Sequence, residues 1–463
     1  MVVYAQLPMA RRGGQRPCHH GVTVSNLSED WLPLLTASSI RIALVVLLAA
    51  LCPARPVAAQ AAEPFADRLS GDWGGLRSDL LERGIDLRLL LISDPYGNSR
   101  GGLETGFTGY SMLSGDLLLD TKPSLGIAGG EIHLGFSVNF GTQLSQDVVG
   151  NTFPIQSSDV APPGGRLTTV SYTQSLLQDR LSLRLGRVSI DSLYGEEFAG
   201  STYFRQFTSV AFNAIPFAIF YNAPAALGYP ATTWGARARY QPNPGFYAMA
   251  GIYNGDPEVG LASRHGLDFT LAGPAFAIGE IGWSRPMQDQ PSGLPGNLKI
   301  GAFSLAGAVP AYGRSVNAGG RHGFYLVADQ AIARYGEPTE GRQLGVFGSL
   351  VTAPNASVSP MPVFFSTGLV ANGPLAARPR DVLSFGLAYG GFSTALAAEQ
   401  RQGALLDPSI RPQRSELTLE LSYGLSLMPG VMIQPGAQLI VHPGGDPATP
   451  SALALGVNAV LSF

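Results

Sequence analysis

The last twelve residues of the chain, ALALGVNAVLSF (residues 452–463), alternate strictly between large apolar side chains and small or polar ones. One face of a strand would carry Leu453, Leu455, Val457, Ala459, Leu461 and Phe463. A soluble sheet rarely ends on such a strand, because an open apolar edge invites aggregation. A strand that closes a membrane barrel, with one face toward lipid, ends in this way. The buried last strand of a β-sandwich also fits, since alternation does not identify the medium on either side.

The same two-residue period recurs along the chain after residue 84. In residues 130–140, GEIHLGFSVNF, large apolar residues alternate with Glu, His, Gly, Ser and Asn. Residues 181–187, 233–240 and 416–423 follow the same pattern. Their apolar faces often end in Tyr, Phe or Trp, as the interface girdles of membrane barrels do. Their polar faces carry fixed charges, which a dry core would have to exclude or pair but a water-filled lumen permits.

Seventeen segments fit this pattern, and a closed bacterial barrel of this kind has an even number of strands. Residues 266–271 are the weakest candidate, so the sequence predicts about 16 strands. The predicted fold class is therefore all-β, a single transmembrane antiparallel β-barrel over residues 85–463. A short N-terminal helix is expected within residues 62–84, because its leucines share one face and Gly84 is placed to end it. This helix would either line the pore or pack plainly on the barrel.

Charge and export signals agree with a membrane barrel. Charged residues make up 14 % of the chain, against about 25 % in ordinary soluble proteins. No apolar run after residue 60 is long enough for a helix to span a bilayer. Residues 1–61 read as a removed leader with a signal peptide, since Arg41 precedes an apolar run and small residues suit cleavage near Ala59 or Ala61. Both cysteines lie in this leader, which excludes a disulfide scaffold in the mature chain.

Several classes of function are disfavoured. Removal of the leader leaves 25 basic and 31 acidic residues, a balance that argues against nucleic acid as a partner. The chain has no G-x-S-x-G elbow, P-loop or H-E-x-x-H motif. Its four remaining histidines, His133, His265, His322 and His442, show no metal-ligand spacing. The sequence therefore predicts no enzyme, no cofactor and no metal site.

One connection between adjacent strands, residues 190–232, is over forty residues long and rich in Phe and Tyr. So long a connection is usually functional or disordered. An aromatic-rich segment is costly to leave in water, so we expect it to fold into the barrel and narrow it. The alternative is an outward cap or an oligomer contact, because exposed apolar patches often mark partner surfaces.

Several stretches resemble the carbohydrate-selective porin family (OprB-type), in matching order and spacing from about residue 66 to the end. They are GDWGGLR (71–77), EIHLGFSV (131–138), YTQSLLQDRLSLRLGR (172–187), ARYQPNPGFYAMAGIYNGDP (238–257), LVADQ (326–330), GLVANGPLAARPRD (368–381) and IQPGAQLIVHPGG (433–445). The resemblance implies a sixteen-stranded barrel in the Gram-negative outer membrane, through which monosaccharides such as glucose diffuse passively. Small carbohydrates and outer-membrane lipid are then the expected partners. The barrel-assembly machinery would recognise the C-terminal strand that ends in Phe463.

The pore-lining candidates follow from the alternation and from the long loop. The charged candidates are Arg184, Arg237, Arg239, Asp116, Asp120, Glu131, Glu280, Glu416 and Glu420. The loop supplies possible stacking faces at Tyr203, Phe204, Phe207 and Tyr221. A guanidinium group presents five donors in one plane and stacks on aromatic rings. Such a lumen exchanges sugar–water hydrogen bonds for sugar–protein ones at little net cost in free energy. Alternatively, these charges pair across strands and keep the barrel open.

Three other functions stay open at this point. A general or weakly anion-preferring diffusion porin has the same fold, and clusters of arginine can override the net charge of the mature chain. A secreted carbohydrate-binding β-protein without a membrane is the second. A barrel enzyme or adhesin is the third, but no nucleophile–base pair supports it. The sequence leaves the oligomeric state undecided.

Overall fold

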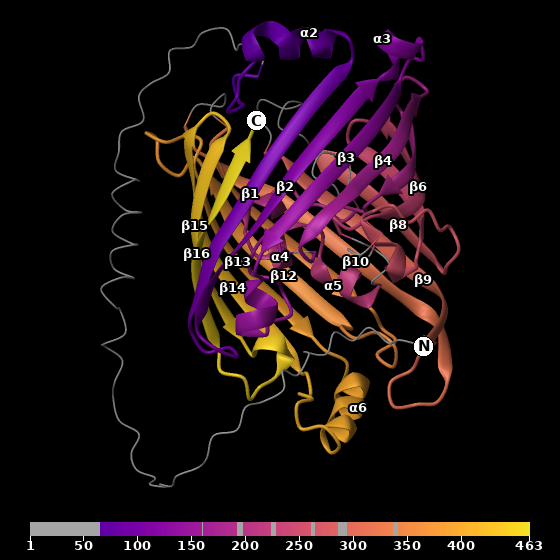
Figure 1. The fold of residues 1–463 in the computed structure, drawn as a ribbon, viewed down its shortest axis with the longest axis vertical. Helices are drawn as coiled ribbons and strands as arrows, with labels where there is room; N and C mark the ends of the chain where they lie inside the picture. The colour runs from indigo at the N-terminus through magenta and orange to yellow at the C-terminus, as the bar shows by residue number, and fades with distance from the viewer. Residues whose placement is uncertain are drawn as a thin grey trace.

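The computed structural model describes residues 65–159, 161–191, 198–223, 228–260, 264–285, 294–336 and 341–463. These residues form one closed barrel of sixteen antiparallel strands, each paired with its neighbours in sequence (Figure 1). The last strand pairs with the first, as the C-terminal alternation predicts. The predicted fold class and strand number are confirmed, whereas the expected leader, residues 1–61, lies outside the described residues.

The strands are β1 (Ile85–Arg100), β2 (Gly106–Asp120), β3 (Gly130–Gly141), β4 (Gly164–Leu176), β5 (Leu181–Val188), β6 (Thr233–Asn243), β7 (Phe246–Asn254), β8 (Ala275–Arg285), β9 (Gly296–Pro310), β10 (Asn317–Arg334), β11 (Gln343–Thr352), β12 (Val363–Asn372), β13 (Val382–Gly391), β14 (Ser415–Met428), β15 (Val431–Val441) and β16 (Ala452–Ser462). The α-helices are α2 (Leu76–Glu82), α3 (Thr121–Leu125), α4 (Val210–Asn213), α5 (Phe217–Asn222) and α6 (Thr394–Ala404). No helix within the described ranges is long and apolar enough to cross a membrane.

The barrel wall has an apolar outer face and a more polar inner face. In β3, Leu134, Phe136 and Phe140 are exposed on the outside, whereas His133 and Asn139 are buried on the inside. Exposed rows of leucine and phenylalanine on every side suit hydrocarbon and not water. Short turns join the strands at the end that holds α2, α3 and the C-terminus, and longer loops join them at the opposite end with α6 (Figure 1). Bacterial membrane barrels place short turns in the periplasm and longer loops outside the cell.

The N-terminal segment closes the seam between β1 and β16. The guanidinium group of Arg77 donates to the main-chain carbonyl oxygens of Leu87 (2.9 Å) and Phe463 (3.2 Å). It lies over the rings of Phe65 and Trp73, 4.3 and 4.8 Å from their centroids. Cation–π contacts of this kind favour a fixed position for the cation. The short helix α2 therefore packs against the barrel wall and ties the chain's last residue to its first strand.

Residues 266–271, the weakest strand candidate, form no strand of the barrel. They belong to the loop between β7 and β8, which lies against the wall beyond the short strand β5. The amide of Leu167 in β4 donates to the carbonyl of His265 (3.0 Å). Arg187 of β5 is 1 % exposed and donates to the carbonyl of Asp268 (3.0 Å). The loop thus completes the wall where β5 has ended, which explains its strand-like sequence.

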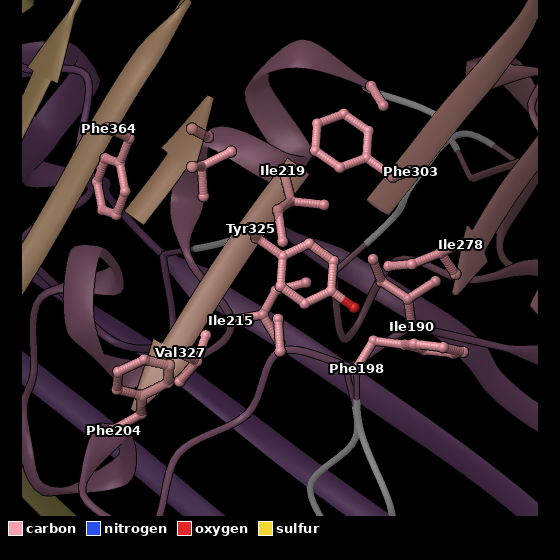
Figure 2. Close-up of a cluster of buried hydrophobic side chains, with 14 of the residues drawn as sticks. Ile190, Phe198, Phe204, Ile215, Ile219, Ile278, Phe303, Tyr325, Val327 and Phe364 are labelled. Carbon is pink, nitrogen blue, oxygen red and sulfur yellow. The ribbon is translucent and has the colours of Figure 1, made fainter. Parts of the chain in front are cut away.

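Two long loops fold into the interior, the β3–β4 loop (residues 142–163) and the β5–β6 loop (residues 189–232). Buried side chains of the β5–β6 loop form one apolar cluster with the inner faces of β7 to β13. Figure 2 shows this cluster, in which Phe204 and Ile219 of the loop lie near Tyr325, Val327 and Phe364 of the wall. The expectation that this aromatic-rich connection folds into the barrel is confirmed.

Candidate functional site in the barrel interior

The inner faces of β2 to β6 carry a connected row of polar side chains, here named the polar wall. His133 Nε2 lies 2.8 Å from Asp116 Oδ1, and His133 Nδ1 lies 3.2 Å from Arg184 Nη2. Arg184 Nε also donates to Ser171 Oγ (3.1 Å). These four residues come from four consecutive strands, so pairing of the strands, and not proximity in sequence, assembles the row.

The arginines of β5 and β6 continue the polar wall. Arg184 and Arg237 are direct cross-strand partners, and Arg237 Nη2 donates to Ser182 Oγ (3.0 Å). The guanidinium carbon of Arg239 lies 4.4 Å from the centroid of the Tyr247 ring. Arg184 and Arg239 keep part of their surface exposed. This stripe therefore offers planar N–H donors beside hydroxyl groups and an aromatic ring.

Asp120 and Glu131 lie at the turn end of the same wall. They are cross-strand partners at the ends of β2 and β3, and both are exposed. The Asp120 carboxylate accepts the backbone N–H of Lys122 (2.9 Å) and caps α3. Asp120 thus has a local structural role, whereas Glu131 presents its carboxylate near the mouth of the barrel.

The inner faces of β8 to β14 form a second region, here named the covered wall, whose carboxylates lie beneath the loops. Glu420 is 1 % exposed and accepts the backbone N–H groups of Thr208 and Ser209, both at 2.8 Å. Glu416 is fully buried and accepts the backbone N–H of Phe153 (2.9 Å) in the β3–β4 loop. A buried carboxylate needs such donors, and hydrogen bonds to a charged group are among the strong ones. These two side chains hold the loops in the barrel.

Glu280 of β8 is also an anchor of the β5–β6 loop. It accepts the backbone N–H of Ala199 (2.6 Å) and the hydroxyl groups of Tyr247 (2.6 Å) and Tyr325 (3.0 Å). Asp329 of β10 plays the same part, since it accepts the hydroxyl of Ser201 (2.8 Å). Glu280, like the two glutamates of β14, therefore attaches a loop to the wall. Its carboxylate is buried and is not exposed to the lumen.

The aromatic candidates lie inside the apolar cluster and not along an open passage. Phe204 and Phe207 each pack edge-to-face on Phe347 with ring centroids 5.5 Å apart. Tyr203 is buried, and burial raises the pKa of its phenol to about 12. Tyr221 packs against the neighbouring rings of α5 and the wall. The structure therefore differs from the sequence-based expectation for Tyr203, Phe204 and Phe207, whose rings are buried, whereas Tyr221 is partly buried and packs against the cluster.

The structure brings Asp116, Arg184, Arg237 and Arg239 together on one wall. The two glutamates of β14 lie on the covered wall, and Glu280 of β8 is joined to Arg239 through Tyr247, which contacts both side chains. His133 was not among the sequence candidates, although the same alternation places it on the inner face of β3. Its role depends on the register, which sets it diagonally from Asp116 and directly opposite Ser171. Within the described residues, no group of three or more His, Cys, Asp or Glu is placed to hold a metal ion.

Comparisons with known proteins agree with this architecture. Porin B of Pseudomonas aeruginosa is 27 % identical over 442 residues, which cover 88 % of this chain and 93 % of that protein. A putative porin, QuiX, of Acinetobacter baylyi is 25 % identical over 429 residues, with coverage of 85 % and 93 %. The high-pH structure of Pseudomonas putida OprB superposes with a TM-score of 0.79 at 23 % identity. The superposition covers 87 % of this chain and 100 % of the Pseudomonas putida chain, and it supports the barrel fold.

The family comparison covers most of the barrel. The profile of the carbohydrate-selective porin, OprB family, matches residues 112–463, well over half of the chain. The match runs from β2 to the C-terminal Phe463 and includes both walls and both inward loops. The chain therefore belongs to the OprB family of carbohydrate-selective porins.

Proposed function

We propose that this porin admits monosaccharides such as glucose by passive diffusion across the outer membrane, along the polar wall. Membership of the family supports a sugar-selective channel, not an enzyme. The observation that carries the finer proposal is the stripe of Arg184, Arg237 and Arg239 beside serine hydroxyls and the Tyr247 ring.

The chemistry of the stripe suits a neutral polyol. Guanidinium groups donate several N–H bonds in one plane and remain charged at any relevant pH. A passing sugar must give up bonds to water, and each is replaced by a bond of similar strength to a guanidinium or hydroxyl group. Weak, exchangeable contacts of this kind let a solute enter and also leave. Arg184, Arg239 and Glu131 keep exposed surface and are the proposed contact residues.

Two measurements test the proposal. Liposomes that contain the porin should swell faster in glucose than in gluconate, an anion of nearly equal size. In planar bilayers, glucose should block the single-channel current, and Arg237→Ala or Arg239→Ala should raise conductance and weaken the block. Arg401→Ala, on the exposed helix α6, is the matched control. Unchanged conductance and block in both wall variants would remove these arginines from the passage.

A second candidate function, an anion-preferring pore of the same fold, is favoured by a specific observation. The glutamates of β8 and β14 are buried beneath the loops, whereas Arg184 and Arg239 keep exposed surface. The arginine stripe is then positive, opposite in sign to the net charge expected for the mature chain, whereas Asp120 and Glu131 are exposed at the turn end of the same wall. A reversal potential in a salt gradient separates the two functions, because an anion pore gives a large potential and little glucose block. Recognition of the C-terminal strand by the barrel-assembly machinery stays a prediction.

A further inference from the structure

His133 lies between two groups of opposite charge, which together place the hydrogen of the neutral ring on Nε2 and leave Nδ1 as an acceptor. A carboxylate only accepts hydrogen bonds, so Nε2 carries hydrogen toward Asp116, 2.8 Å away. A guanidinium group only donates, so Nδ1 offers its lone pair to Arg184, 3.2 Å away. The neutral ring with hydrogen on Nε2 satisfies both neighbours at once.

A second proton changes one of these two contacts. An imidazolium ring keeps its bond to Asp116 but presents an Nδ1–H to a guanidinium N–H, where two donors and two positive charges meet. Arg184 then keeps the hydrogen bond from Nε to Ser171, but its Nη2 no longer has His133 Nδ1 as an acceptor. The arginine side chain is long and flexible, so its free end turns toward the water of the lumen.

Charged side chains from several strands surround His133. Asp116 faces it from β2, Arg184 from β5, and Glu131 precedes it on its own face of β3. Arg88 of β1 is the cross-strand partner of Asp116, and Asp86 accepts from Arg88 at 2.8 Å. Ser171, directly opposite on β4, contributes a hydroxyl. Arg237 lies one strand further on, opposite Arg184.

We propose that His133 is a positioning residue for Arg184, and that its protonation makes sugar passage depend on pH. The neutral ring holds the guanidinium group against the polar wall, in the geometry that contacts a sugar. The charged ring releases it. The inference rests on the proposed function, because it assumes that Arg184 contacts the passing sugar.

The expected signature is a pH-dependent block of the channel by glucose. The concentration of glucose for half-block should rise about threefold to tenfold as the pH falls from 8 to 5, the effect of losing one hydrogen bond. His133→Gln should retain tight block and lose this pH dependence, because its amide donates to Asp116 and accepts from Arg184 without titrating. His133→Ala should show weak block at every pH, since Arg184 loses its support.

Controls separate positioning from general effects. His322→Gln, an exposed residue on β10, should keep the full pH dependence of the native porin. Heat-modifiable migration in detergent verifies that each variant forms the barrel. Equal pH dependence in native porin and His133→Gln would overturn the inference. If Arg184→Ala left the block at pH 8 unchanged, the assignment of Arg184 under the proposed function would fail instead.

Discussion

On the polar wall, Arg184 and Arg237 donate to hydroxyl groups of neighbouring strands, and part of the Arg184 side chain stays exposed. On the covered wall, Glu416 and Glu420 occupy equivalent inward positions but accept N–H groups of the loops. Both sets of charges follow from the same alternation of inward and outward side chains. The difference indicates that an inward charge in a barrel is available to a passing solute only where no loop covers it.

Removal of the loop anchors is expected to have the largest effect. The double variant Glu416→Ala, Glu420→Ala leaves several loop N–H groups without acceptors, and each lost bond to a charged group costs about 1.5–3 kcal/mol. The loops should leave the covered wall, so that single-channel conductance rises severalfold and glucose block disappears. Asp407→Ala, in the loop that follows α6, is the control and should leave both unchanged. Unchanged conductance in the double variant would show that the loops are held without these carboxylates.

A cavity in the apolar cluster tests the same loop without a change of charge. Phe207 packs against the rings of Phe212 and Phe347, and truncation of a buried phenylalanine typically costs about 3–5 kcal/mol. We expect Phe207→Ala to lower the thermal unfolding midpoint and to expose the β5–β6 loop to protease. Phe207→Leu, which keeps most of the apolar volume, should fall between this variant and the native porin. A native-like protease pattern in Phe207→Ala would mean that the cluster contributes little to docking of the loop.

On the polar wall, Arg239→Lys separates charge from hydrogen-bond geometry. Lysine keeps the positive charge and lacks the planar group that lies over the Tyr247 ring and presents several N–H donors in one plane. If the passage recognises sugar hydroxyls, glucose block should weaken about threefold, since roughly one hydrogen bond is lost. Ion selectivity, read from the reversal potential, should not change. A shift in selectivity with unaltered block would favour the anion-preferring pore.

A further prediction concerns Asp159 in the β3–β4 loop. Burial raises the pKa of its carboxyl to about 7, from an ordinary value of 3.8. Between these two values the folded chain binds more protons than the unfolded chain, so stability falls as the pH rises from about 4 to 7. Above about pH 7 this contribution is constant. The thermal unfolding midpoint should follow this slope in the native porin.

Asp159→Asn supplies the comparison, because its side chain carries no titrating proton and still accepts from Gln143. This variant should lose that part of the slope of the unfolding midpoint between pH 4 and 7. It should also be more stable than the native porin at pH 8. The same slope in both proteins would place the pH dependence elsewhere.

Sequence reasoning was most successful where a residue's role depends on its own neighbours in the chain. The alternation in β3 places Leu134 and Phe136 outward, and the structure agrees. The aromatic content of residues 190–232 indicates burial, and the loop is buried. The rings of Phe204 and Phe207 differed from expectation because their burial is against the wall, which composition does not specify.

The sequence by itself determined the strands and the two faces of the wall, because these follow from a local period of two. That period gave seventeen segments, and the even number of strands in closed barrels reduced them to sixteen. Only the tertiary structure decided which inward charges remain available. Glu420 meets Thr208, 212 positions away, and His133 meets Arg184, 51 positions away. Such contacts depend on strand register and on the docking of loops, and neither is encoded in a local pattern of side chains.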